Sequence, residues 1–159
     1  MKTFTSQIFM FLILVTWFNF FSLQSKAQSF SHPATGLVVT GDVMHAQSGS
    51  NFIGVVYSRT GNVYYNQVNP AGVWGEETLL GTGSEARLAI DSNDHPHVVY
   101  TAATSPTKIA YFKFDGSNWS EVVYIESLNN GGTGSCSKPD LAVAINGDIH
   151  ITYTDSHGS

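Results

Sequence analysis

Residues 84–101 have the sequence SEARLAIDSNDHPHVVYT, and residues 137–154 have the sequence SKPDLAVAINGDIHITYT. Leu, Ala, Asn, His, Tyr and Thr coincide in the two segments at a constant offset of 53 residues. A single register kept over a whole segment indicates an internal repeat, and repeat periods of tens of residues are typical of solenoids and propellers. The repeat therefore decides the class of fold.

A second shared block lies between these segments. Val63-Tyr-Tyr65 followed by Trp74 matches Ile109-Ala-Tyr111 followed by Trp119, at offsets of 46 and 45 residues. The one-residue difference indicates an extra residue in the turn of the first copy. The repeat unit thus extends well beyond the segments quoted above.

A third, weaker copy comes earlier in the chain. Val55-Val-Tyr-Ser58 precedes Val98-Val-Tyr-Thr101 by 43 residues. The offset between segments 84–101 and 137–154 is larger, at 53 residues, which indicates an insertion between them. We place this insertion in the polar, glycine-rich run 129–136. Cys136 in this run is interpreted as an exposed loop thiol. The chain then contains one full unit flanked by incomplete units.

The local pattern within each unit is that of β-strands. Short runs rich in Val, Ile, Tyr and Phe are separated by clusters of Gly, Asn, Asp and Pro, as in strands joined by tight turns. Strands are predicted near 37–43, 52–58, 62–68, 76–80, 86–91, 97–102, 108–114, 121–126, 139–144 and 149–154.

Four strands in about 45 residues is the repeat of a β-propeller blade. We therefore predict an all-β propeller of four-stranded blades, with about two to three blades present as an N-terminal fragment of a six- or seven-bladed ring. A β-sandwich is the alternative, since it gives similar strands, but it offers no reason for one register to recur.

Residues 1–27 are interpreted as a signal peptide. Lys2 precedes the apolar run 8–15, and Ser25 and Ala27 are the small residues expected at a cleavage site. The apolar segment is shorter than the roughly 18–20 residues of a membrane-spanning helix. We expect residues 28–159, the incomplete propeller domain, to be secreted or held at the cell surface or in the periplasm after bacterial-type export, with no membrane span after cleavage.

Composition excludes other classes of protein. Lys2 and Lys26 leave with the signal peptide, so five basic residues remain against twelve acidic ones, a formal net charge of −7. Nucleic acid is therefore not expected as a partner, because phosphate binding needs clustered Lys and Arg. A lone cysteine, Cys136, allows no intrachain disulfide. No cofactor is predicted, and no metal site either, because the His95 and His97 pair lacks a clearly placed third ligand.

Two segments carry a family resemblance. Leu88–Tyr100 and Ile109–Trp119 resemble repeats of secreted bacterial β-propellers related to sialidases and fucose-binding lectins. Asp115–Trp119 is similar to a degenerate Asp-box turn, and its counterpart Asn69–Trp74 has lost the Asp. The resemblance implies the propeller fold and, as the alternative activity, that of a sialidase-like glycoside hydrolase.

The resemblance also implies what a sialidase centre would require, which includes three arginines that hold the substrate carboxylate. This chain has only Arg59 and Arg87, and lysine cannot reproduce the bidentate geometry of a guanidinium. We therefore predict no catalytic residue in this chain and no catalysis by it alone. In the alternative hypothesis, the chain is part of a sialidase-like hydrolase whose catalytic residues lie mostly in other blades.

Recurrent aromatic and polar residues supply the candidate site. Flat aromatic rings stack on sugars, so we predict Trp74, Trp119, Tyr65 and Tyr111 as ligand-binding residues. Residues used once per unit are predicted to serve packing or turns, and they are Leu88, His97, Tyr100, Asp115, Trp119, Leu141, His150 and Tyr153. The predicted function is a secreted binding or scaffold module for a glycan or an extracellular protein.

Incomplete repeats predict a solution property. Two to three blades would leave apolar faces and strand edges in water, because each repeat buries its faces against its neighbours. We expect isolated residues 28–159 to self-associate or to be poorly soluble, as measured by size-exclusion chromatography with light scattering. A monodisperse monomer that melts cooperatively would contradict the propeller interpretation.

Overall fold

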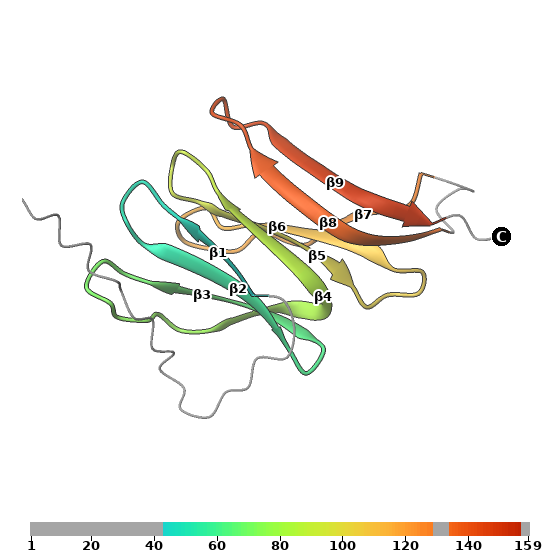
Figure 1. Ribbon diagram of the computed structural model, residues 1–159, viewed down its shortest axis with the longest axis horizontal. Helices are drawn as coiled ribbons and strands as arrows, with labels where there is room; N and C mark the ends of the chain where they lie inside the picture. The colour runs from blue at the N-terminus through green and yellow to red at the C-terminus, as the bar shows by residue number, and fades with distance from the viewer. Residues whose placement is uncertain (1–42, 129–133, 157–159) are drawn as a thin grey trace, which may run out of the picture. The chain divides into compact units, whose positions relative to one another are not determined.

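The computed structural model describes residues 43–128 and 134–156, and their regular structure is entirely β (Figure 1). This confirms the all-β prediction. Within these ranges there is no helix long and apolar enough to cross a membrane. The strands are β1 (Val43–Gln47), β2 (Ile53–Arg59), β3 (Asn62–Val68), β4 (Thr78–Ile90), β5 (Pro96–Ala102), β6 (Lys108–Lys113), β7 (Val123–Ile125), β8 (Ser135–Val143) and β9 (Ile149–Ser156).

Most strands lie where the sequence predicts them, within a few residues. The predicted signal peptide 1–27 and nearly all of the predicted strand 37–43 lie outside the described residues. The two strands predicted at 76–80 and 86–91 form the single strand β4. That part of the prediction was wrong because the glycines between them continue the strand instead of breaking it.

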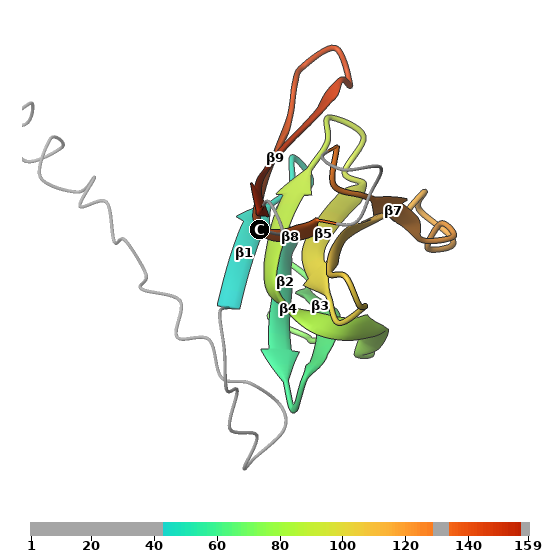
Figure 2. The same cartoon turned by 90° about the vertical axis from the view of Figure 1, so that its right-hand side faces the viewer.

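Strand β4 connects two antiparallel meanders. Its first part, Thr78–Thr82, pairs with β3, and its second part, Gly83–Ile90, pairs with β5. Strands β1 to β7 consequently form one open sheet in sequence order, while β8 and β9 form a separate two-stranded sheet. Strand β8 packs beside β4 and β5 (Figures 1 and 2).

The hairpin turns repeat with the offsets found in the sequence. A residue with positive φ occupies the same place in three turns, at Asn51 (68°), Asp94 (63°) and Gly147 (89°), which are 43 and 53 residues apart. Two backbone hydrogen bonds close each turn. In one, the residue with positive φ donates its N–H to the carbonyl three residues earlier. In the other, that earlier residue donates its N–H to the carbonyl four residues further on, as in the pairs Ser48 to Phe52, Asp91 to His95 and Ala144 to Asp148.

A β-bulge also recurs and links neighbouring units. Glu85 and Lys138, 53 residues apart, have φ angles of 56° and 52° at equivalent register shifts in β4 and β8. The Glu85 carboxylate accepts hydrogen bonds from the Thr101 hydroxyl at 2.7 Å and from the Lys138 backbone N–H at 2.8 Å. One side chain therefore joins the second meander to the hairpin that follows it.

Cys136 corrects one prediction. It is fully buried in β8 rather than exposed in a loop, and its backbone N–H donates to the Thr107 carbonyl at 2.9 Å. Its side chain belongs to a buried cluster with Val99 and Ile109. The residues around Cys136 in the sequence are polar or glycine, so the sequence does not indicate a strand there. The strand packs there through the one small apolar side chain of Cys136.

The larger core lies between the two meanders. Strand β5 is buried at every position, and Leu88 and Tyr100 belong to the main core cluster. Their equivalents in the third unit, Leu141 and Tyr153, are only partly buried against the smaller cluster. His150 is exposed, whereas its equivalent His97 is buried.

Gly83 is predicted to be intolerant of a side chain. A Cβ at this position would lie 2.3 Å from the Thr101 carbonyl oxygen and 2.7 Å from the Tyr100 ring. Gly83→Ala should therefore cost about 1–3 kcal/mol of unfolding free energy through overpacking, as measured by urea denaturation. Gly75→Ala is the control, because its nearest new contact is at 3.6 Å. Equal urea midpoints for the two variants would contradict the close approach seen here.

Candidate functional site

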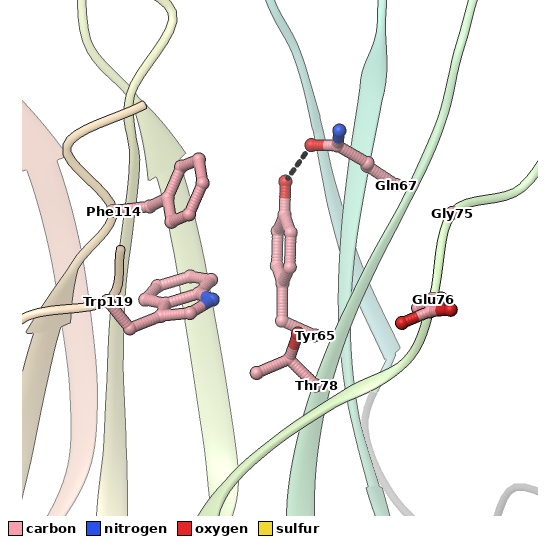
Figure 3. Close-up of a pocket in the computed structure, with 7 residues that line it drawn as sticks. All are labelled: Tyr65, Gln67, Gly75, Glu76, Thr78, Phe114 and Trp119. Atoms are coloured by element: carbon pink, nitrogen blue, oxygen red, sulfur yellow. Dashed lines mark hydrogen bonds between the residues drawn. The ribbon is translucent and has the colours of Figure 1, made fainter. Parts of the chain in front are cut away.

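A hollow of about 130 Å³ opens between the first meander and the connection from β6 to β7. Strands β3 and β4 and the segment that joins them supply one side, and the β6–β7 connection supplies the other (Figure 3). The residues that line it are Tyr65, Gln67, Gly75, Glu76, Thr78, Phe114 and Trp119.

The turn at Asp115 holds the aromatic side of the hollow. The Asp115 carboxylate accepts hydrogen bonds from the backbone N–H groups of Ser117 and Asn118, each at 2.8 Å. These bonds lower the pKa of the carboxyl group. The turn brings Phe114 and Trp119 into an antiparallel bridge, and their ring centroids are 5.5 Å apart.

The equivalent turn of the first unit uses an amide in place of the carboxylate. The Asn69 side-chain oxygen accepts hydrogen bonds from the N–H groups of Ala71 and Val73, each at 3.0 Å, and Val68 bridges to Trp74. In both turns a side-chain oxygen accepts the backbone hydrogen bonds. Asn has such an oxygen, so it can replace Asp in this role.

Tyr65 forms the floor between the two sides of the hollow. Its ring meets the Trp119 indole edge to face, with centroids 5.0 Å apart and planes at 70°. Its hydroxyl donates to the Gln67 side-chain oxygen at 3.1 Å (Figure 3). Burial raises the pKa of Tyr65 well above its usual value, so the phenol keeps its proton and serves as a donor.

Polar groups face the aromatic side. Figure 3 shows Gln67 and Glu76 across the floor from Phe114 and Trp119. Among the described residues, the Glu76 carboxylate, the Thr78 hydroxyl and the Trp119 indole N–H have no hydrogen-bonding partner. An acceptor, a hydroxyl and a donor are thus available beside aromatic rings.

A single carboxylate lines the described hollow. Glycoside hydrolysis ordinarily uses a pair of carboxyl groups, and the neighbouring Glu77 is engaged elsewhere. Glu77 forms an ion pair with Arg59 at 2.6 Å and accepts a hydrogen bond from the Tyr57 hydroxyl. Glu76 is therefore the one carboxylate among the described residues that line this hollow, and the pair that a glycosidase uses is not present among them.

Of the four predicted ligand-binding residues, two line the hollow and two do not. Tyr65 and Trp119 line it, whereas Trp74 and Tyr111 lie elsewhere. Sequence reasoning missed Phe114, Gln67, Glu76 and Thr78 as lining residues. Phe114 directly precedes the Asp115 turn, and this position was a signal that could have identified it; the polar residues carried no such signal.

Tyr111 belongs to a partly buried hydrogen-bond network with His97. Its hydroxyl lies 2.8 Å from His97 Nδ1, and His97 Nε2 lies 3.3 Å from the Asp91 carboxylate. Because a carboxylate can only accept, Nε2 carries the imidazole proton and Nδ1 accepts from the tyrosine hydroxyl. Burial lowers the pKa of His97 and outweighs the raising effect of Asp91, so the ring is neutral.

Asp91 is the acceptor at the centre of this network. Burial by itself raises the pKa of the Asp91 carboxyl, but hydrogen bonds from the backbone N–H groups of His95 and Asn93 outweigh it and lower the pKa to about 2. His95 and Lys113 also approach this carboxylate, at 3.5 and 3.7 Å. Within residues 43–128 and 134–156, no group of three or more His, Cys, Asp or Glu is arranged to hold a metal ion.

Comparisons with known proteins add no assignment: no protein-family model and no curated protein sequence matches this chain.

The His97 network predicts a pH dependence of stability. The pKa of His97 is lower in the folded protein than its ordinary value of 6.5, so the unfolded chain binds a proton first as the pH falls. Unfolding free energy should therefore decrease below pH 6.5, by at most about 1.4 kcal/mol per pH unit, and should level off once folded His97 is protonated. Urea denaturation between pH 8 and pH 5 measures this decrease.

The matched variants for this test are His97→Gln and His150→Gln, since His150 is the exposed equivalent. His97→Gln should remove most of the decrease and His150→Gln should leave it unchanged. The same pH profile in both variants would show that His97 is not its source.

Proposed function

We propose that this protein is a secreted β-propeller-type module that binds a glycan in the hollow between its first two units. The fold part of the proposal is supported by the two four-stranded meanders joined through β4 and by the third hairpin with equivalent turns. Four-stranded antiparallel units repeated about every 45 residues are typical of propeller blades.

The observation that carries the binding function is the composition of the hollow. The partly exposed Trp119 and Phe114 supply aromatic surface beside the buried Tyr65. Glu76 and Thr78 supply polar groups that no described residue satisfies. A sugar ring needs this combination, because its C–H groups pack on aromatic faces while its hydroxyl groups need hydrogen bonds. Ligand sites generally combine an apolar lining with a few convergent polar groups.

The location between repeats also favours binding. The aromatic side comes from the second unit and the polar side from the first, so any further unit added in the same way would create another such junction. Repeat proteins commonly use surfaces that extend over several units. A binding module built in this way gains avidity from weak individual sites.

A glycan array probed with the full chain tests the proposal. We expect sugar binding, with a loss of at least about tenfold, or ~1.4 kcal/mol, in Trp119→Ala. Because Trp119 also packs against the core, the exposed Gln67→Ala and the hydroxyl-removing Thr78→Val provide variants less able to disturb folding, and each should weaken binding.

Trp74→Ala serves as the matched control, since Trp74 occupies the equivalent turn but does not line the hollow. Equal losses in Trp74→Ala and Trp119→Ala would contradict this location. A fluorogenic sialoside assay on the same preparation separates binding from hydrolysis, and turnover would contradict a pure binding function.

A further inference from the structure

The charge of the hollow bears on which glycan it accepts. Glu76 is the ionisable carboxylate among the lining residues, and no Lys or Arg is found among them. The whole chain has a formal net charge of −5. The local potential therefore disfavours a sugar acid, whose carboxylate would enter the site without a cationic partner.

The nearby cations do not change this balance. Arg59 forms an ion pair with Glu77 at 2.6 Å, and its guanidinium lies 4.3 Å from the centre of the Tyr64 ring. Lys113 approaches Asp91 at 3.7 Å. Both cations lie beside carboxylates that do not line the hollow. Neither therefore neutralises the negative charge of Glu76.

Glu76 is placed to meet a ligand. Its side chain is exposed, it has no ion-pair or hydrogen-bonding partner among the residues that the structure describes, and it lies across the Tyr65 ring from Trp119 and Phe114 (Figure 3). Aromatic faces attract cations as well as sugar C–H groups, and tryptophan does so most strongly. A free carboxylate opposite aromatic rings therefore suits a ligand that carries both a sugar ring and a positive charge.

The second unit shows that this charge pattern is particular to the hollow. The residue equivalent to Glu76 is Glu121, but the residue equivalent to Gln67 is Lys113. Glu121 is exposed and does not line the hollow. The chain thus contains its own matched control for a carboxylate at the same place in the repeat.

We propose that the hollow selects glycans with a protonated amino group, of the glucosamine type, over N-acetylated sugars, and rejects sugar acids. This selectivity rests on the proposed glycan-binding function. It assigns Glu76 as the residue that sets the preference, while the aromatic rings provide the affinity that all accepted sugars share.

The test compares three probes on the full chain by calorimetry: a glucosamine oligomer, its N-acetylated counterpart and a sialylated oligosaccharide. We expect the glucosamine oligomer to bind about tenfold more tightly than the N-acetylated one at low salt, and the sialylated probe to bind most weakly. The preference should shrink at high salt, because it is electrostatic.

Two variants decide the origin of the preference. Glu76→Gln should remove the difference between the amino and N-acetylated probes while keeping N-acetylated binding, and Glu121→Gln should leave the difference intact. Equal affinity for the two probes in the unsubstituted chain, or an equal effect of the two substitutions, would overturn the selectivity and leave glycan binding standing. Failure of all three probes to bind, with the fold verified by circular dichroism, would overturn the proposed function as well.

Discussion

The continuity of β4 is the constraint on which the rest of the described structure depends. One half of the strand pairs with β3 and the other half with β5, so both meanders are fixed to a single backbone. This continuity requires Gly83, because the Thr101 carbonyl and the Tyr100 ring occupy the space where a Cβ would stand. A strand interior ordinarily disfavours glycine, and its presence here is typical of a close backbone approach.

The hollow is a consequence of that connection. Because β4 carries the chain from β3 to β5 without a long loop, the β6–β7 turn of the second meander comes to lie beside Tyr65 of the first. The site is therefore made at a junction between units. Its lining combines residues that recur in the repeat, such as Tyr65, Glu76 and Trp119, with Gln67, whose equivalent is Lys113.

Much of the fold could be predicted from the repeat. The offsets of 43 and 53 residues recur in the positive-φ positions Asn51, Asp94 and Gly147, because a tight turn needs the same backbone conformation whichever residue supplies it. Asp115 was similarly visible as a turn residue. These features depend on local backbone geometry, which short sequence patterns record well.

The features that could not be predicted depend on contacts between distant segments. Gln67 and Glu76 have no local pattern that marks them as lining residues, and only the meeting of two meanders brings them opposite Trp119. Tyr111 was a reasonable aromatic candidate, yet its hydroxyl is held by buried His97. The polar composition around Cys136 also led to the wrong prediction of an exposed loop. The composition of a segment does not show which one of its side chains faces a core.

The burial of Cys136 gives the protein a built-in chemical reporter. Burial raises the pKa of its thiol, and thiolate is the form that reacts with alkylating reagents. Since Cys136 is the sole cysteine and its backbone joins β8 to Thr107, alkylation requires β8 to separate from the neighbouring meander. The rate of modification under native conditions thus reports the population of a locally opened state in which the Cys136 thiol is exposed, an opening that need not coincide with global unfolding.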